Sequence, residues 1–152
     1  MIEAKGGFPQ QVSFITKDGN QTFEELGDGI KTVVLTRDNL YRRAVIRKLD
    51  KKKVVYRILF RRGIYANTDT IVYTAADQDW PLAARKEKKC TTELVVGDQI
   101  QPVDIDDNFW EVVEVTKTEG LHDVWSVEVI DGDSFALRNT IPTMSVEVKR
   151  ER

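Results

Sequence analysis

Apolar and polar residues alternate along most of this 152-residue chain. A period of two residues is the pattern of a strand with one buried and one solvated face, so it excludes a mainly helical protein. Turn-forming residues interrupt the alternation at short intervals, as at 17–20 (Lys-Asp-Gly-Asn) and 27–29 (Gly-Asp-Gly). Many short strands separated by turns are typical of a barrel or sandwich. We therefore predict an all-β protein built from short antiparallel strands.

The alternating pattern assigns strands to the ranges 12–16, 21–23, 31–36, 44–48, 54–60, 70–74, 99–103, 109–116, 124–130 and 145–150. Helix is expected only as single turns at 22–26 and 92–94. No low-complexity stretch or linker interrupts the chain, and its length suits one ordinary domain. Residues 1–152 are therefore expected to form a single domain.

Two stretches of the chain resemble each other. Val45 is followed by a charged turn and an aromatic-rich strand at 55–60, and Val113 is followed in the same way by a strand at 124–129. Each stretch is expected to form a hairpin. A duplicated β unit with pseudo-twofold symmetry would produce this similarity.

The composition excludes several classes of protein. Cys90 is the only cysteine, so neither an intrachain disulfide nor a cysteine-based zinc site can form, and His122 is the only histidine. No apolar run approaches the roughly 18 residues of a membrane span. Residues 1–5 hold no apolar signal-peptide core, so cytoplasmic synthesis is expected. Mean hydropathy is -0.39, as in soluble globular proteins, and no cofactor is predicted.

Charge is distributed unevenly, although the formal net charge is only -2. Basic residues dominate between Arg42 and Arg62, opposed only by Asp50, whereas acidic residues dominate between Asp98 and Asp133, opposed only by Lys117. Such regions can be solvated strand faces, can attract each other within the fold, or can face partners.

Two sets of residues are candidates for partner contacts. The basic stretch could touch a nucleic acid backbone, although a pI of about 5.5 argues against general affinity for nucleic acid. Its candidate contacts are Arg42, Arg43, Lys51, Lys52 and Lys53. Trp80 lies in an apparent loop beside a proline, and an aromatic side chain in a loop often anchors an interface. Its alternative is a loop residue folded back over the core, while Trp110 and Trp125 are expected in the core.

Other possible chemical sites have simpler interpretations. Cys90 follows several basic residues that could lower its thiol pKa, but a half-buried residue entering a strand is the better interpretation. His122 is expected to be exposed in a hairpin turn. The acidic stretch 104–108 lacks the spaced final carboxylate of a calcium loop and is expected to be a turn, as is 131–133.

The order of the segments resembles an intein, the self-splicing member of the Hint (Hedgehog/intein) family. Residues 7–19 are similar to the first motif of the family, and residues 22–26 to the short helical turn after it. Residues 71–77 fall at the Thr-x-x-His motif, 93–98 match a Leu-x-x-Gly-Asp segment, and 124–145 align on the two terminal motifs without a gap. The resemblance covers about residues 7–145 and implies a compact Hint-like β fold.

The same resemblance implies that the splicing residues are replaced. Splicing starts with a thiol or hydroxyl nucleophile at the first motif position, which here is Gly7. Thr74 is retained, but Asp77 stands in place of the motif histidine, and an ionised carboxylate is a poor proton donor at neutral pH. The remaining positions with a chemical role in the family are Ser126, Asp133, Thr143, Met144 and Ser145. Ser126 replaces an aspartate, Asp133 a histidine and Thr143-Met144 the terminal His-Asn pair, and only Ser145 remains as an acceptor.

The sequence therefore predicts a non-enzymatic structural or interaction module on an intein-like fold. Protein partners or self-assembly are expected, for instance as a subunit of a bacteriophage virion, with no membrane or small-molecule substrate. One alternative is a self-processing domain in which Ser13 or Ser145 reacts. A second alternative is a nucleic-acid-binding β domain that uses the basic stretch between Arg42 and Arg62.

Overall fold

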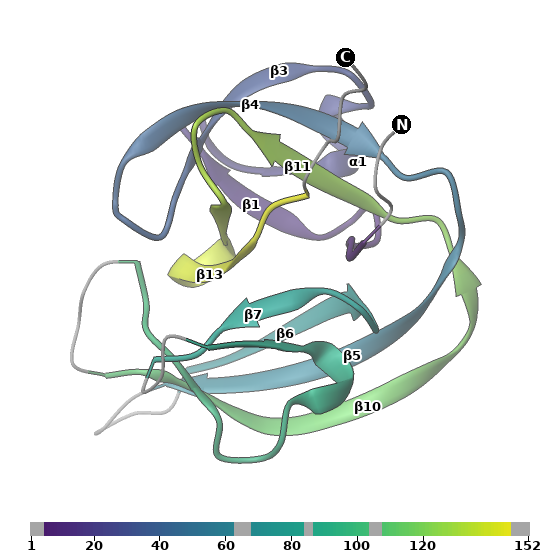
Figure 1. Ribbon diagram of the computed structural model, residues 1–152, viewed down its shortest axis with the longest axis vertical. Coiled ribbons are helices and arrows are strands. Elements are labelled where there is room, and N and C mark those ends of the chain that lie inside the picture. Colours follow the sequence, from purple (N-terminus) through teal and green to yellow (C-terminus); the bar gives the residue numbers. More distant parts are fainter. Residues whose placement is uncertain (1–4, 63–67, 84–86, 104–107, 147–152) are drawn as a thin grey trace.

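The structure, a computed structural model, describes residues 5–62, 68–83, 87–103 and 108–146. Two curved sheets lie one above the other, and a two-stranded ribbon packs between them (Figure 1). Every strand pair is antiparallel. The prediction of an all-β protein with minimal helix is confirmed.

The strands of the described residues, in chain order, are β1 (Ser13–Thr16), β2 (Gly19–Thr22), β3 (Lys31–Leu35), β4 (Tyr41–Lys48), β5 (Lys53–Arg62), β6 (Thr68–Ala75), β7 (Asp79–Pro81), β8 (Lys88–Cys90), β9 (Gln99–Ile100), β10 (Trp110–His122), β11 (Trp125–Val129), β12 (Ser134–Leu137) and β13 (Ile141–Met144). Three single helical turns accompany them, α1 (Phe23–Leu26), η1 (Thr91–Glu93) and η2 (Arg138–Thr140). The upper sheet has the order β11-β4-β3-β1-β12-β13, with β2 paired to β1, the lower sheet has the order β6-β5-β10-β9, and β7 pairs with β8.

The first hairpin and helical turn form where the sequence predicts them. β1 and β2 pair around the predicted turn, and the Thr16 hydroxyl donates to the Gly19 carbonyl at 2.9 Å. Thr22 then caps α1, because its side-chain oxygen accepts from the Glu25 backbone N–H at 3.1 Å. This turn buries Phe23 against the core.

The two similar stretches of sequence do not form hairpins, so that prediction is wrong. β4 lies in the upper sheet and continues into β5 in the lower sheet, and β10 continues into β11 in the opposite direction (Figure 1). β4 pairs with β11 and β5 pairs with β10. The similar stretches therefore run antiparallel to each other across both sheets, an arrangement that suits the predicted pseudo-twofold symmetry.

Other segments also differ from expectation, and no strand is predicted where β8, β12 and β13 form. Residues 79–81, predicted as loop, form β7. His122 is exposed as expected but is the last residue of β10 rather than part of a hairpin turn. The last described strand is β13, which ends before the predicted strand at 145–150; residues 147–150 lie outside the described part, as do residues 104–107 of the acidic stretch.

The main core fills the space between the sheets and is rich in aromatic side chains. Phe8 packs edge-on against Trp80 and Phe135, with ring centroids 6.1 and 5.9 Å apart. Trp110 is buried as predicted, whereas Trp125 is half-buried and packs against the core. The N-terminal segment is therefore anchored by Phe8, the residue directly after Gly7. None of the described helices is long and apolar enough to cross a membrane.

Candidate functional site

Three segments that are distant in sequence meet beside the core: the N-terminal segment before β1, the residues leading into β7, and β13. Phe8 holds the first segment in place through its buried ring and through two backbone hydrogen bonds with Trp125, both 2.7 Å. The Ala75 N–H donates to the Gly7 carbonyl at 2.8 Å, which sets the N-terminal segment beside the end of β6.

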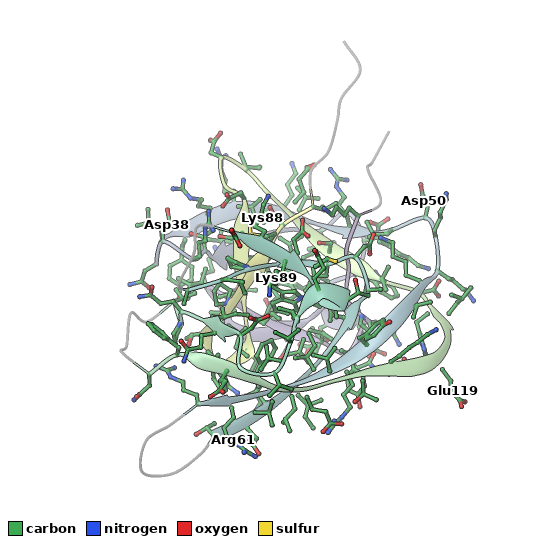
Figure 2. The ribbon with its side chains drawn as sticks, turned by 60° about the horizontal axis from the view of Figure 1, so that its bottom comes forward. Asp38, Asp50, Arg61, Lys88, Lys89 and Glu119 are labelled. Atoms are coloured by element: carbon green, nitrogen blue, oxygen red, sulfur yellow. The ribbon has the colours of Figure 1, made fainter. Side chains whose placement is uncertain are left out.

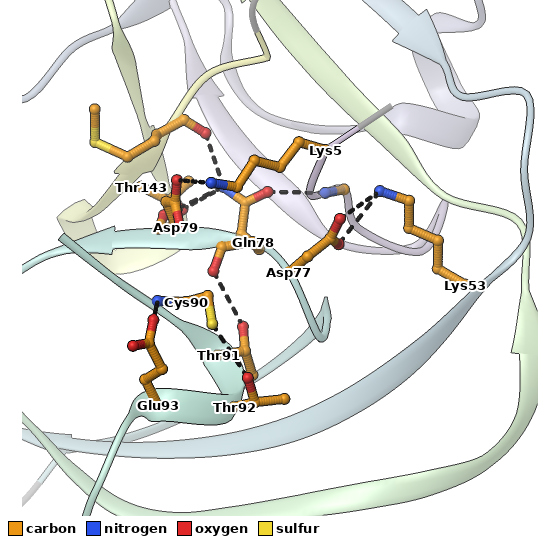
Figure 3. Close-up of polar contacts among 12 residues, drawn as sticks. Lys5, Lys53, Asp77, Gln78, Asp79, Cys90, Thr91, Thr92, Glu93 and Thr143 are labelled. Carbon is orange, nitrogen blue, oxygen red and sulfur yellow. Dashed lines mark hydrogen bonds and ion pairs between the residues drawn. The ribbon is translucent and has the colours of Figure 1, made fainter. Parts of the chain in front are cut away.

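The side chain of Gln78 joins these segments. Its Oε1 accepts from the Gly7 N–H at 2.8 Å, and its Nε2 donates to Thr143 Oγ1 and to the Met144 carbonyl, both at 2.8 Å (Figure 3). The Thr143 hydroxyl donates in turn to the Asp79 carbonyl at 3.0 Å. Gln78 is only 2% exposed, so a neutral amide supplies both an acceptor and two donors in a place that water does not reach. We call this arrangement the Gln78 junction.

The peptide between Gly6 and Gly7 is bound at both of its polar atoms. Lys53 Nζ donates to the Gly6 carbonyl at 2.8 Å, while Gln78 accepts from the Gly7 N–H. Lys53 also forms an ion pair with Asp77, 3.1 Å between Nζ and Oδ2. A cation on the carbonyl oxygen and an acceptor on the amide N–H both polarise this peptide.

A second ion pair lies on the other side of Gln78. Lys5 Nζ is 2.8 Å from Asp79 Oδ2, and Figure 3 shows the two pairs on either side of the glutamine. The hydrogen bond to Asp79 raises the pKa of Lys5 above its ordinary 10.5.

Both glycines of the bound peptide have backbone angles that disfavour side chains. Gly6 has φ +78° and Gly7 has φ +121°. A Cβ on Gly7 would lie 2.9 Å from both Cβ and Cγ2 of Val124 and 3.1 Å from Cδ1 of Leu49, while a Cβ on Gly6 would collide with Oε1 of Gln78. The space beside position 7 is therefore filled by neighbouring apolar side chains.

Comparison with known proteins identifies solved structures of the same architecture. No protein-family model and no curated protein matches the chain. Among solved structures, a mutant of the Ssp DnaB mini-intein has a TM-score of 0.76 at 14% identity, covering 100% of this chain and 98% of its own. The gp41-1 intein has a TM-score of 0.70 at 15% identity, covering 92% and 98%. A bacterial intein-like domain from Clostridium thermocellum has a TM-score of 0.66 at 13% identity, covering 91% and 97%. The chain has the intein-like Hint fold.

On this Hint fold, three of the eight motif positions meet at the Gln78 junction: Gly7, Thr143 and Met144. Two others lie close in sequence but have different contacts. Asp77 pairs with Lys53, and the buried Thr74 hydroxyl makes a long 3.5 Å contact with the Ala75 carbonyl.

The last three motif positions lie outside the Gln78 junction and make other contacts within the described part of the chain. Ser126 is buried on β11, and its Oγ has no hydrogen-bond partner among the residues that the structure describes. Asp133 is exposed and pairs with Arg37, 3.1 Å between Oδ2 and Nη2. The half-buried Ser145 donates its backbone N–H to the Asp133 carbonyl at 2.9 Å.

Sequence reasoning missed Gln78, the residue that binds Gly7, and emphasised its neighbour Asp77. A usable signal was present in the alternation of the segment. Three buried side chains of this segment stand at even-numbered positions, namely Thr74, Gln78 and Trp80. Asp77 stands at an odd-numbered position and is half-buried. Extending the alternation past the end of the predicted strand at 74 would have placed Gln78 inward.

Of the two alternatives for Trp80, the structure matches the one in which it packs on the core, and the side chain is not exposed to a partner. Its side chain is 0% exposed, packs on Phe60 with centroids 5.5 Å apart, and donates its indole N–H to Thr91 Oγ1 at 3.0 Å. Of the other partner candidates, Arg43, Lys51 and Lys52 are exposed. The remaining two candidates have internal partners, Arg42 through Asp38 and Lys53 through Asp77.

The two other reactive side chains have local contacts. The half-buried Cys90 makes a 3.1 Å contact between its Sγ and Thr92 Oγ1, and His122 Nε2 lies 2.9 Å from the Glu119 carbonyl. Within the described ranges, no group of three or more His, Cys, Asp or Glu side chains could hold a metal ion.

Proposed function

We propose that this chain is a non-splicing Hint domain that acts through contacts with other proteins. The observation that carries the proposal is the environment of Gly7. Splicing requires a nucleophilic side chain at this position. Two atoms of Val124 would lie only 2.9 Å from the Cβ of any such side chain, and φ is +121°, so the local packing matches a glycine.

The downstream position supports the same proposal. In splicing inteins an asparagine at the position of Met144 cyclises and releases the segment after it. A methionine thioether cannot cyclise in this way, and the Met144 side chain is buried, with 8% exposure. Its carbonyl is bound by Gln78 at 2.8 Å.

The contacts that polarise the Gly6–Gly7 peptide have a structural role in this proposal. With no nucleophile at position 7, Lys53 and Gln78 act as hydrogen-bonding partners that hold the N-terminal segment against β7 and β13. A buried polar group without a partner costs about 1–3 kcal/mol, so these contacts stabilise the domain. The setting that we propose is a larger protein assembly, such as the bacteriophage particle expected from the sequence.

The nucleic-acid alternative has less support. Several residues of the basic stretch form ion pairs with carboxylates of the same chain, among them Arg47 with Glu128, Arg61 with Asp69, and Arg57 with Glu114. The charge of these residues is thus balanced within the fold. Titration of the chain against labelled DNA and RNA at low salt tests this alternative, and salt-sensitive binding lost in the double variant Lys51→Gln/Lys52→Gln would support it.

A fusion of the whole chain between two reporter domains of different mass tests the main proposal. The fusion is incubated at neutral pH with and without dithiothreitol and hydroxylamine, which cleave thioesters and esters, and is followed by intact mass spectrometry. A splicing-competent intein between the same reporters is the positive control. We expect the fusion with this chain to keep its full mass while the control is processed.

The variants Ser145→Ala and Ser13→Ala test the self-processing alternative, in which one of these serines reacts. A fragment whose mass places the cut at Gly6–Gly7, Val12–Ser13 or Met144–Ser145, and which disappears in one of these variants, would contradict the proposal. In that case the chain would be an active self-processing domain.

A further inference from the structure

Among the described residues, one edge of the lower sheet is open. Within them β6 pairs with β5 on one side only, in the order β6-β5-β10-β9. Ala75 directs its N–H away from β5 toward Gly7, whereas the next residue, Ala76, donates back to the Val54 carbonyl at 3.1 Å. Because backbone groups alternate along a strand, the N–H groups of Ile71 and Tyr73 also point away from β5.

Beyond Asp69 at its start, this edge lacks the usual protection against pairing. Natural edge strands are blunted by charged side chains, proline or bulges. The segment 70–75 reads Thr-Ile-Val-Tyr-Thr-Ala, without charge or proline, and its pairing with β5 runs without a register shift. Ile71 is 48% and Tyr73 37% exposed, and among the described residues only Gly7 pairs with the outer side of β6, at Ala75.

A hollow of about 310 Å³ lies at the end of this edge. Its apolar lining includes Tyr73, Val55 and Trp125, and Pro9 lies beside them. This volume is at the small end for ligand pockets and suits one or two side chains.

Two carboxylates and one histidine line the hollow. Glu119, His122 and Asp123 are all exposed, and Figure 2 shows Glu119 pointing outward at the bend of β10. Lys48 Nζ is already placed over the Trp125 ring, 5.2 Å from its centroid. A second cation entering the hollow would therefore meet the two carboxylates rather than this ring.

We propose that the open edge of β6 and this hollow bind an extended, basic segment of a partner protein. The segment pairs with Ile71 and Tyr73 as an added strand, and one Lys or Arg side chain enters the hollow. Its aliphatic stem packs on Tyr73 and its charge meets Glu119 and Asp123. Backbone pairing supplies the affinity and the hollow supplies the specificity. This proposal rests on the function proposed above, since it names the partner chemistry of the interaction module.

Fluorescence anisotropy with the whole chain tests the proposal. The probe is a fluorescein-labelled peptide of sequence Thr-Val-Thr-Arg-Thr-Val-Thr, and the matched probe has Glu in place of Arg. We expect the Arg peptide to bind at least about tenfold more tightly than the Glu peptide, because only one of them complements Glu119 and Asp123. The double variant Glu119→Gln/Asp123→Asn should bind the Arg peptide about tenfold more weakly and should no longer prefer it to the Glu peptide.

A second pair of variants tests the added strand. Ile71→Pro removes one N–H on the open side and leaves the bonds to β5 intact, so binding should fall about tenfold. Ile71→Thr keeps that N–H and serves as the matched control, and thermal unfolding verifies that both variants fold. Equal binding of the two peptides, no binding at about 1 mM protein, or equal effects of Ile71→Pro and Ile71→Thr would overturn the proposal.

Self-association is the remaining outcome. If light scattering shows a dimer that Ile71→Pro converts to monomer, and neither peptide binds, then a second copy of the chain occupies the edge and the peptide proposal is wrong. The peptide experiment and the fusion experiment are independent, since peptides that fail to bind say nothing about whether the fusion is cut. The two proposals therefore fail in distinguishable ways.

Discussion

At the scale of single residues, one neutral amide connects segments that lie 71 and 66 residues away from it in sequence. Gln78 can do this because an amide carries an acceptor and two donors on one side chain. A carboxylate has no donor in its ionised form, and an ionised group would be costly to bury at 2% exposure. The junction therefore requires an amide at position 78, where a carboxylate such as that of the neighbouring Asp77 could not make the same contacts.

The contribution of Gln78 can be measured by replacing it with leucine, which has a similar size. Gln78→Leu leaves the Gly7 N–H and the Met144 carbonyl buried without partners, so we expect a loss of about 2–4 kcal/mol in the free energy of unfolding. Urea denaturation followed by tryptophan fluorescence measures this loss. The exposed Gln101→Leu is the matched control and should change stability by less than about 0.5 kcal/mol. Equal effects of the two substitutions would show that the junction adds nothing to stability.

At the scale of elements, the β7–β8 ribbon depends on a single large side chain. Each of its strands has three residues, too few for a stable free hairpin. Trp80 fixes the ribbon through its aromatic contacts with Phe8 and Phe60 and through its hydrogen bond to Thr91, the first residue of η1. The residue expected to bind a partner thus holds the domain together.

The substitution Trp80→Phe tests this role. It keeps an aromatic ring but leaves a cavity and removes the indole N–H from a buried Thr91 hydroxyl, so we expect a loss of about 2–3 kcal/mol. Differential scanning calorimetry gives the change. Trp125→Phe, at a half-buried position, should have a clearly smaller effect. Comparable losses from both substitutions would argue against a special role for Trp80.

Alternation predicted the main strands well, because each side chain's face depends only on neighbours in sequence. β1, β3, β4, β5 and β6 all overlap predicted strands. Alternation could not show which strands pair, since it is the same for a hairpin and for a strand that continues into another sheet. Val45 and Val55 therefore looked like two sides of one hairpin, although β4 pairs with β11 and β5 with β10. The Gln78 junction was missed for the same reason, because its partners come from distant segments.

At the scale of the whole molecule, the shifted pKa values of three carboxyl groups and one lysine predict a plateau of stability between acid and alkaline limits. The side-chain hydrogen bond from Arg61 lowers the pKa of Asp69 from its ordinary 3.8, and the Thr36 hydroxyl does the same for Asp38. The Cys90 N–H lowers the pKa of Glu93 from its ordinary 4.5. A carboxyl with a lowered folded-state pKa adds stability above its unfolded pKa, and this is lost as pH falls through the folded value.

The contribution of Lys5 to stability depends on pH in the opposite direction. Its pKa is raised above 10.5 by Asp79, so its contribution is full below that value and is lost as pH rises through the folded pKa. We expect the thermal midpoint to be highest between about pH 5 and pH 9 and to fall on both sides. The effects are small because these groups are largely solvated.

The substitution Asp69→Asn separates the acid contribution of one pair. It removes the carboxylate that Arg61 binds at 2.8 Å, so the midpoint should fall less steeply below about pH 4 than in the unchanged chain. Circular dichroism melts between about pH 3 and pH 11 measure both profiles. If the thermal midpoint falls equally steeply at low pH in both proteins, then this exposed ion pair contributes nothing to stability.

The joining of the two end segments has a mechanical consequence. Both segments also bind β11, Phe8 through Trp125 and Val146 through its N–H to the Val127 carbonyl at 3.0 Å. A force that pulls the neighbours of this domain apart would enter at one end segment and leave at the other. It would pass through the amide of Gln78 and the short stretch of β11 between Trp125 and Val127, so the lower sheet and the rest of the core would carry little of the tension.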